Sequence, residues 1–414
     1  MGRRQENRNR SFYQPCSLDN IDFNYISTIA MIFRILILIG GCKCYIRNAL
    51  FSFLFLLSFH FTGVSYAGSF EYGPGFNAQE CDAILQLNLA FLDTALDSKF
   101  EDMVEGYAIY HRTPSLGLDN RADIWIRKDS TVVITLRGTT SDRGSILQDF
   151  YCAMVPAKGV VKTAKDRSFE YVLASDDRSA VHAGFLIGFA YLGEYLTPKI
   201  RQLYNSGYRK FIIGGHSQGG ALCYYFSAWL MQMKKQSVYP DIFVKTYASA
   251  APKMGNMYFA YDYDNANLSQ WSFSIVNTAD PVPEMPFTTQ QVDIDMNEPN
   301  PILNLMKRFD ELPFLKRIML KSAFNRMKKR AKKSSDAYQK YLGNYLGKFI
   351  HNILPELQLP EAVGSTYFVR PGVPIILAVN EKYWNYYKDG PKYFHHGIEP
   401  YRFLLREYFL HAIK

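Results

Sequence analysis

The chain has 414 residues, of which 48% are hydrophobic and 21% are charged. This composition is typical of a globular protein with a sizeable core, and it excludes a chain that is disordered over most of its length. The formal net charge is +9, but residues 307–333 alone hold 11 Lys or Arg and only two Asp or Glu, so the basic character belongs to one segment.

Residues 1–67 have the features of a leader segment. An apolar run at 50–61 follows two basic residues, and Ser65 and Ala67 stand at the −3 and −1 positions of a small-x-small cleavage site. This pattern predicts a secretory signal peptide that ends at Ala67, and therefore a secreted or exported protein. The run is short for a membrane span, which needs about 20 apolar residues.

Two alternatives for the leader stay open. An earlier apolar stretch at 31–41 ends just before Cys42, which faintly resembles a lipoprotein cleavage site. Two short membrane segments that are not cleaved would instead anchor the chain in a membrane.

Three cysteines follow the leader, namely Cys81, Cys152 and Cys223. Their number and wide spacing indicate neither a disulfide framework nor a metal site, and they allow at most one disulfide bridge.

Beyond residue 67, helical and strand-like segments alternate along residues 68–414. Apolar residues at helical spacing predict an amphipathic helix over 78–98. Runs rich in β-branched and aromatic residues predict strands, as does a late β-pair. These predicted strands are 131–136, 210–214, 243–249, 272–277 and the pair 366–370 with 373–379. The alternation predicts an α/β fold with a mainly parallel central sheet flanked by helices.

Residues 299–360 interrupt the alternation and form a predicted basic helical insertion. Prolines bound the segment, and Pro313 is expected to break its helix. A helix that combines apolar and basic residues favours an anionic membrane surface. The cations expected to face that surface are Lys316, Arg317, Lys328, Lys329 and Arg330. The alternative is a solvated cover over part of the fold. Nucleic acid is not expected as a partner, because no recognition motif accompanies the charge.

The strongest local motif is Gly215-His216-Ser217-Gln218-Gly219, a G-x-S-x-G sequence. It follows a predicted strand and precedes a predicted helix that runs to about Met233. A sharp turn in this context exposes a nucleophilic serine, and small residues on either side let the backbones pass closely. The N–H of Gln218 would point at the reacting carbonyl.

A serine hydroxyl needs a base, and the base needs an orienting acid. Asp280 follows the predicted strand 272–277, and two adjacent histidines, His395 and His396, come later in the chain. The order Ser, Asp, His is the order of α/β-hydrolases. From the residues alone, either histidine is a candidate base.

At this point the chain resembles the class 3 lipase family of the α/β-hydrolase superfamily, which includes the fungal triacylglycerol lipases. The segments that carry the resemblance occur in the order of the family. They are ITLRGTTS (134–141), VHAGF (181–185), FIIGGHSQGGAL (211–222), YASAAPKMGN (247–256), IVNTADPVPEMP (275–286) and HHGIEPY (395–401).

The resemblance implies a role for each matching residue. Ser217 would be the nucleophile and Asp280 the acid, and His396 would be the base because Tyr401 follows it by five positions. Thr139 and Gln218 would supply the oxyanion hole. Position 218 is a departure from the family, since leucine is usual there.

The function that the resemblance implies is that of a serine lipase. It would hydrolyse glycerolipid esters, triacylglycerol or phospholipid, at a membrane or emulsion surface through an acyl-enzyme. This chemistry requires no metal and no organic cofactor. The alternatives are a soluble short-chain carboxylesterase and a catalytically inactive protein that binds membrane surfaces.

Overall fold

A computed structural model describes residues 72–92, 104–268, 270–388, 390 and 394–410 of the chain. The chain divides into two units, Met1–Tyr66 and Ala67–Lys414, and every described residue belongs to the second. The predicted leader therefore lies outside the described residues.

A seven-stranded sheet forms the centre of the fold, with strands in the order β1-β2-β3-β8-β9-β10-β11. The β1–β2 and β2–β3 pairs are antiparallel, and the four pairs from β3 to β11 are parallel. The strands are β1 (Tyr107–Arg112), β2 (Ala122–Arg127), β3 (Val132–Leu136), β8 (Lys210–His216), β9 (Phe243–Ser249), β10 (Ser272–Asn277) and β11 (Val373–Leu377). The mainly parallel sheet predicted from the sequence is confirmed.

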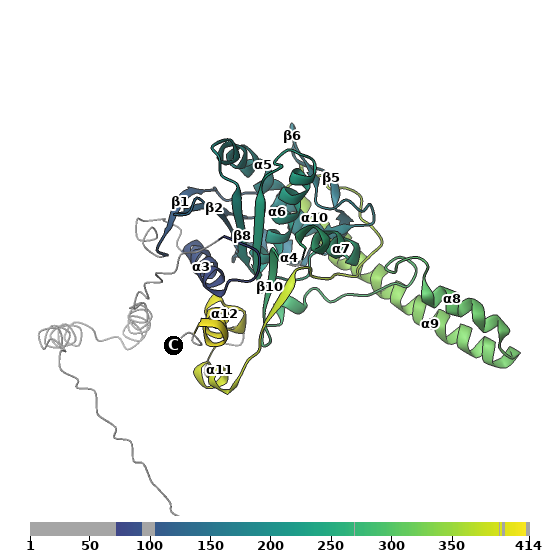
Figure 1. The fold of residues 1–414 in the computed structure, drawn as a ribbon. Coiled ribbons are helices and arrows are strands. Elements are labelled where there is room, and N and C mark those ends of the chain that lie inside the picture. Colours follow the sequence, from purple (N-terminus) through teal and green to yellow (C-terminus); the bar gives the residue numbers. More distant parts are fainter. Residues whose placement is uncertain (1–71, 93–103, 269, 389, 391–393, 411–414) are drawn as a thin grey trace, which may run out of the picture. The chain divides into compact units, whose positions relative to one another are not determined.

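Helices cover both faces of this sheet (Figure 1). On β3, Val132 and Ile134 pack in one hydrophobic cluster with α5 (Ala183–Asn205) and α6 (Gln218–Lys235). Val133, between them, packs in a second cluster with α3 (Ala78–Leu89) and α12 (Ile398–Leu405). Neighbouring residues of a strand point to opposite faces, so strands buried on both sides appear as continuous apolar runs.

Further elements decorate this core. They are β4 (Met154–Pro156) paired with β7 (Ala180–His182), the hairpin of β5 (Lys158–Ala164) and β6 (Arg167–Val172), α4 (Arg143–Phe150), α7 (Met257–Asn267), α11 (Glu381–Tyr386), and the short turns η1 (Ala90–Leu92), η3 (Val282–Glu284), η6 (Phe394–His396) and η7 (Arg406–Leu410).

Two sequence predictions differ from the structure. The predicted β-pair is wrong, because β11 pairs in parallel with β10, and residues 366–370 make only isolated bridges to Thr289 and Gly255. Gly372, at a φ of +89°, lies between the two segments and its N–H donates to Asp264 of α7, while each segment pairs with a different part of the chain. The predicted helix 78–98 is helical through Leu92, and its last six positions lie outside the described residues.

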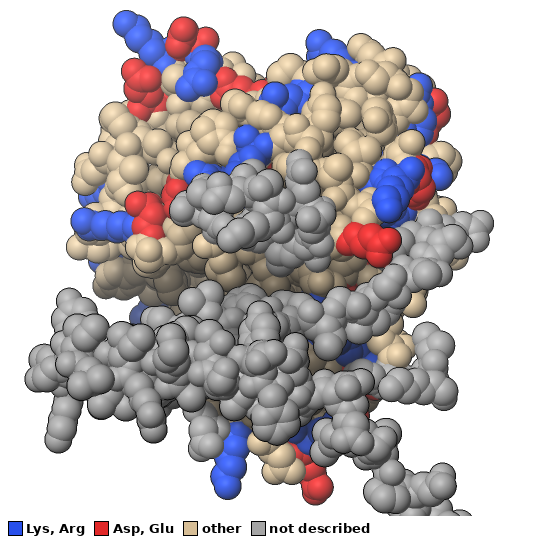
Figure 2. Space-filling model, turned by 90° about the vertical axis from the view of Figure 1, so that its left-hand side faces the viewer, with Lys and Arg blue, Asp and Glu red and all other residues tan. Residues whose placement is uncertain are grey.

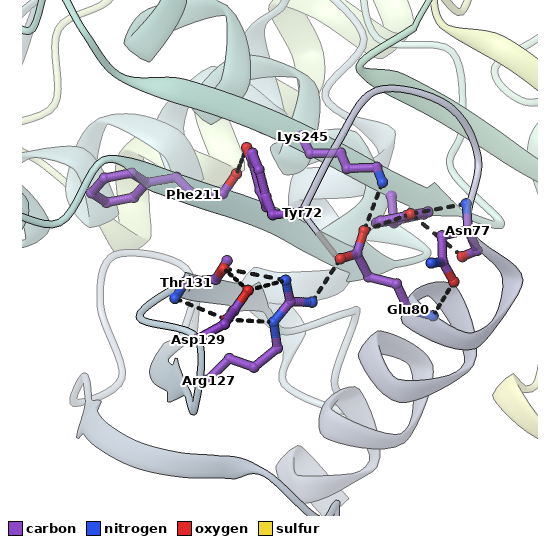
Figure 3. A network of polar contacts seen from close by, with 9 residues as sticks. Tyr72, Asn77, Glu80, Arg127, Asp129, Thr131, Phe211 and Lys245 are labelled. Carbon is purple, nitrogen blue, oxygen red and sulfur yellow. Dashed lines mark hydrogen bonds and ion pairs between the residues drawn. The ribbon is translucent and has the colours of Figure 1, made fainter. Parts of the chain in front are cut away.

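A buried charge network ties α3 to the sheet (Figure 3). Glu80 of α3 accepts hydrogen bonds from Arg127 of β2 at 2.6 Å and from Lys245 of β9 at 2.8 Å. The side chains of all three are at most 2% exposed. Charges buried in this way need partners of opposite sign, so the network holds α3 in one place on the sheet.

The insertion is helical, with α8 (Pro301–Arg308), the turn η4 (Phe309–Glu311), α9 (Phe314–Tyr338), the π-helical segment η5 (Gln339–Tyr345) and α10 (Leu346–Ile353). Pro313 is the N-cap of α9 and separates it from α8. In Figure 1, α8 and the first part of α9 lie side by side and extend away from the sheet. None of the helices in the described ranges is long and apolar enough to cross a membrane.

Candidate active site

Ser217 lies on a strained turn between β8 and α6. Its φ of +60° and ψ of −126° are unfavourable for a residue with a side chain, and its backbone opens α6. The turn is possible because its neighbours are glycines. A Cβ on Gly219 would stand 2.1 Å from the carbonyl oxygen of Leu136, and one on Gly215 would stand 2.4 Å from Gly219. The turn therefore requires both glycines named in the motif.

Three side chains from distant parts of the chain meet at this turn. The Ser217 hydroxyl lies 2.8 Å from Nε2 of His396, and Nδ1 of His396 lies 2.8 Å from Oδ2 of Asp280. The Asp280 side chain is fully buried at the end of β10. Because the carboxylate can only accept, Nδ1 carries the proton, and Nε2 is free to accept the proton of Ser217.

Two further hydrogen bonds hold Asp280. The Tyr401 hydroxyl donates to Oδ2 at 2.6 Å, and the N–H of Val282 donates to Oδ1 at 2.9 Å. Tyr401 lies on α12, which Arg402 fixes to α3 through a buried ion pair with Asp82. The position of the acid thus depends on α12, the helix that directly follows the two histidines.

The two adjacent histidines have different surroundings. Nδ1 of His395 lies 2.7 Å from the Tyr383 hydroxyl, and the backbone carbonyl oxygen of His395 accepts a hydrogen bond from the Asn277 side chain. The carbonyl oxygen of His396 accepts a 2.6 Å hydrogen bond from Nε2 of His216. Burial lowers the pKa of His216 to about 4, so its ring is neutral at pH 7. The structure places His396, and not His395, against Ser217.

The two predicted oxyanion-hole residues line the same pocket as Ser217. Among the described residues, neither the N–H of Thr139 nor that of Gln218 has a hydrogen-bond acceptor. Gln218 is the first residue of α6, where a helix leaves its N–H groups without partners. Both N–H groups are therefore available to a ligand.

A partly buried carboxylate, missed by sequence reasoning, joins these two residues. Asp149 of α4 accepts hydrogen bonds from the Thr139 hydroxyl and from the Gln218 side chain, each at 2.8 Å. The Gln218 amide also donates to the Ser145 carbonyl at 3.0 Å. Burial raises the pKa of Asp149 to about 6, although these two hydrogen bonds and the nearby His396 lower it. No sequence motif marks Asp149; the uncommon glutamine at 218 was the available signal.

The pocket above Ser217 has a volume of about 930 Å³ and a mainly apolar lining. Its walls come from α4, η1, the loop that follows Asp280, η5 and α12. The apolar side chains that line it are Leu89, Phe91, Leu92, Phe150, Phe185, Val282, Met285, Pro286, Phe287, Leu342 and Ile398. An apolar pocket of this volume, with a few polar groups, suits an acyl chain attached to a reacting ester.

The cysteines form neither a disulfide nor a metal site among the described residues, although Cys152 lines the pocket. Cys81, Cys152 and Cys223 are buried and free, with no disulfide between them. Within the described ranges, no group of three His, Cys, Asp or Glu is arranged to hold a metal ion.

The five cations predicted to face a membrane all lie on α9. Lys316, Lys329 and Arg330 are exposed, and Arg317 is partly exposed. Lys328 forms an ion pair with Asp293 at 2.7 Å. The far end of the same helix reaches the pocket, because Tyr338 is one of the lining residues.

Comparisons with known proteins agree with the motifs. The family described as lipase (class 3) matches residues 133–290. No curated protein matches the chain.

Among solved structures, the chain is similar to three fungal lipases. A Rhizomucor miehei lipase–propeptide complex is 21% identical, with 53% of this chain and 67% of that chain covered and a TM-score of 0.36. The lipase of Rhizopus microsporus var. chinensis is 23% identical over 50% of this chain and 69% of that chain, with a TM-score of 0.35. The Lip2 lipase of Yarrowia lipolytica is 18% identical over 52% of this chain and 77% of that chain, with a TM-score of 0.39.

The matched residues 133–290 include most of β3, the Ser217 turn and Asp280. The family model matches less than half of the chain, and the described residues form an α/β fold with a mainly parallel sheet that helices cover on both faces.

Proposed function

We propose that the chain is a serine lipase that hydrolyses glycerolipid esters, triacylglycerol or phospholipid, through a Ser217–His396–Asp280 triad. The observation that carries the proposal is the continuous hydrogen-bonded series from Ser217 through His396 to Asp280 at the floor of an apolar pocket. A soluble short-chain esterase would not need an apolar pocket of this volume. An inactive binding protein would not need the three groups in this order.

The chemistry follows from the geometry. Nε2 of His396 removes the proton of Ser217 while its oxygen attacks the ester carbonyl, and Asp280 stabilises the imidazolium that forms. The oxyanion accepts hydrogen bonds from the N–H groups of Thr139 and Gln218, and such a donor contributes about 3–4 kcal/mol of barrier lowering. His396 then protonates the leaving alcohol, and an acyl-enzyme remains. Water, activated by His396, attacks it and releases the fatty acid.

The test is hydrolysis of long-chain phospholipid, triacylglycerol and a soluble butyrate ester by the chain from Gly68, beside Ser217→Ala. We expect fatty-acid release that falls on the order of 10³-fold or more in the variant. His396→Ala should lose as much, whereas His395→Ala should retain most activity. Equal inactivity of wild type and Ser217→Ala on all three substrates would leave the inactive binding protein as the better interpretation. Activity confined to the butyrate ester would favour the short-chain esterase.

We further propose that the enzyme is exported and meets its substrate at an anionic phospholipid surface. The leader motif that ends at Ala67 and the net positive charge of residues 307–333 support this. The mass of the N-terminus isolated from the producing cell tests export. A mature chain that begins at Gly68 is the expected result, and an intact leader in the membrane fraction would indicate an anchored enzyme.

A further inference from the structure

The α8–α9 hairpin packs against almost nothing in the part of the chain that the structure describes. None of residues 301–334, which we call the arm, is buried, and the only buried residues of α8 and α9 are Ser335 and Tyr338 at the far end. Helices in proteins are normally stabilised by packing one face against a core. A hairpin of this length without buried residues indicates an interaction with something other than the described residues.

The tip of the arm carries large exposed apolar side chains. Just after Pro313, the exposed fractions are 64% for Phe314, 74% for Leu315, 48% for Ile318 and 72% for Met319. Leu305 on α8 is 52% exposed. Single exposed apolar residues are ordinary, but a contiguous group on a projecting element marks an interaction site.

Cations, most of which have no acidic partner among the described residues, follow this tip along α9. Arg317, Lys321, Arg326 and Lys329 line one shallow groove together with Ile318. Of the 11 Lys and Arg at 307–333, carboxylates of the described residues pair with only three, Lys321, Lys328 and Lys332. On the face of the molecule shown in Figure 2, by contrast, cationic and anionic side chains are interspersed.

An apolar tip followed by uncompensated cations matches the depth profile of an anionic bilayer. The apolar side chains would enter the acyl boundary, and the cations would lie at the level of the lipid phosphates. An acidic protein surface would satisfy the cations but not the exposed tip. We propose that the arm docks the enzyme on anionic phospholipid membranes, with Phe314, Leu315, Ile318 and Met319 inserted and the α9 groove on the headgroups.

The arm is also connected to the pocket. α9 runs without interruption from the tip to Tyr338, which lines the pocket that holds Ser217, a length of about 37 Å for 25 residues. Docking at one end therefore positions the pocket relative to the membrane at the other. The inference rests on the proposed lipase function, because an enzyme that hydrolyses membrane lipids must bring its pocket to the membrane.

The test measures vesicle binding in the Ser217→Ala background, so that lipolysis does not alter the vesicles. The protein is the chain from Gly68, which contains all strands and hydrophobic clusters of the described residues. The vesicles contain phosphatidylcholine alone or phosphatidylcholine with about 30% phosphatidylglycerol, which makes their surface strongly anionic. Binding is measured by co-sedimentation at low and high salt.

Two arm variants separate the two contributions. R317Q/K321Q/R326Q/K329Q should weaken binding to anionic vesicles about 100-fold and remove most of its salt dependence. L315S/M319S should weaken it about tenfold and leave the salt dependence in place. Matched controls with exposed residues outside the arm, K128Q/R167Q/K382Q and V160S/V238S, should bind like the parent.

Unchanged binding of both arm variants to anionic vesicles would overturn the proposal. So would vesicle binding that the control variants reduce equally. If the parent binds no vesicles at all, the arm has another occupant, and an acidic protein becomes the better candidate. Hydrolysis of the soluble butyrate ester, with Ser217 restored, reports on the triad alone. Arm variants that retain it while losing vesicle binding separate failure of docking from failure of the proposed catalysis.

Discussion

Gln218 and Thr139, the two predicted oxyanion-hole residues, are joined through a single carboxylate. The Gln218 amide donates to Oδ1 of Asp149 and the Thr139 hydroxyl donates to Oδ2, each at 2.8 Å. The loop that carries Thr139 is fixed further by Thr140, whose N–H donates to Ser145. The spacing of the two free N–H groups therefore depends on one side chain of α4, and on a glutamine where the family usually has leucine.

We expect Gln218→Met to lower kcat about tenfold with little change in KM. Methionine fills the same space but cannot donate to Asp149, and the loss of one hydrogen bond to a charged group is typically about 1.5–3 kcal/mol. Steady-state kinetics on the soluble butyrate ester measures the effect. Gln232→Met is the control, because Gln232 lies on the same helix and donates to Asp262, away from the site. An equal loss in both variants would show a general effect on α6.

The stability of the protein should depend on the ionisation of Asp149. Its pKa of about 6 in the folded chain is above the value of about 3.9 expected when unfolded, so the native state binds the proton more tightly. This contribution to stability is complete below about pH 4 and is lost as the pH rises through 6. The difference in unfolding free energy between wild type and Asp149→Asn, from urea titrations, should therefore increase as the pH falls from 7 to 4.5. A constant difference would contradict the assignment.

Tyr401→Phe should reduce kcat by about three- to tenfold. The hydroxyl donates to the Asp280 oxygen that also accepts from His396, so its loss relaxes the orientation of the acid without removing it. Steady-state kinetics on the soluble butyrate ester measures the loss. Tyr383→Phe is the matched variant, since the Tyr383 hydroxyl contacts His395 instead, and it should leave kcat nearly unchanged.

Gly219→Ala should destabilise the fold by about 3 kcal/mol or more, since the added Cβ would overlap the Leu136 carbonyl at 2.1 Å. Strand β3 would have to move away from the Ser217 turn, so activity should be lost with stability. Gly343→Ala serves for comparison, because its nearest neighbour would be 3.5 Å away, and its unfolding temperature should remain close to that of wild type. Thermal unfolding of both variants gives the answer.

Glu80→Gln should cost about 3–5 kcal/mol of stability, because Lys245 then remains buried without a carboxylate. Chemical denaturation measures the loss. The exposed pair of Glu105 and Lys128, whose charged atoms are 4.0 Å apart, provides the contrast, and Glu105→Gln should be neutral within error. A small effect of Glu80→Gln would mean that water reaches Lys245.

Local chemistry explains what could be predicted from the sequence. The turn at Ser217 is specified within about ten residues by a β-branched strand, two glycines and the helix that follows, and backbone sterics at such a turn leave few alternatives. Asp280 could be found in the same way, because it directly follows β10. The order of strands and helices also follows from local hydrophobic patterns, which predict the parallel sheet.

Only the tertiary structure decided the relationships that join distant segments. β11 pairs with β10, about 100 positions earlier, and no local pattern distinguishes that partner from the neighbouring segment 366–370. The choice between His395 and His396 depends on their partners in the fold. Tyr383 contacts the ring of His395, and His216 donates to the backbone carbonyl of His396, whose ring lies against Ser217. The sequence by itself determined the nucleophile turn, the fold class and the basic character of α9. The role of Asp149 and the unpacked state of the arm depend on what else lies nearby in space, and burial is a property of the folded chain.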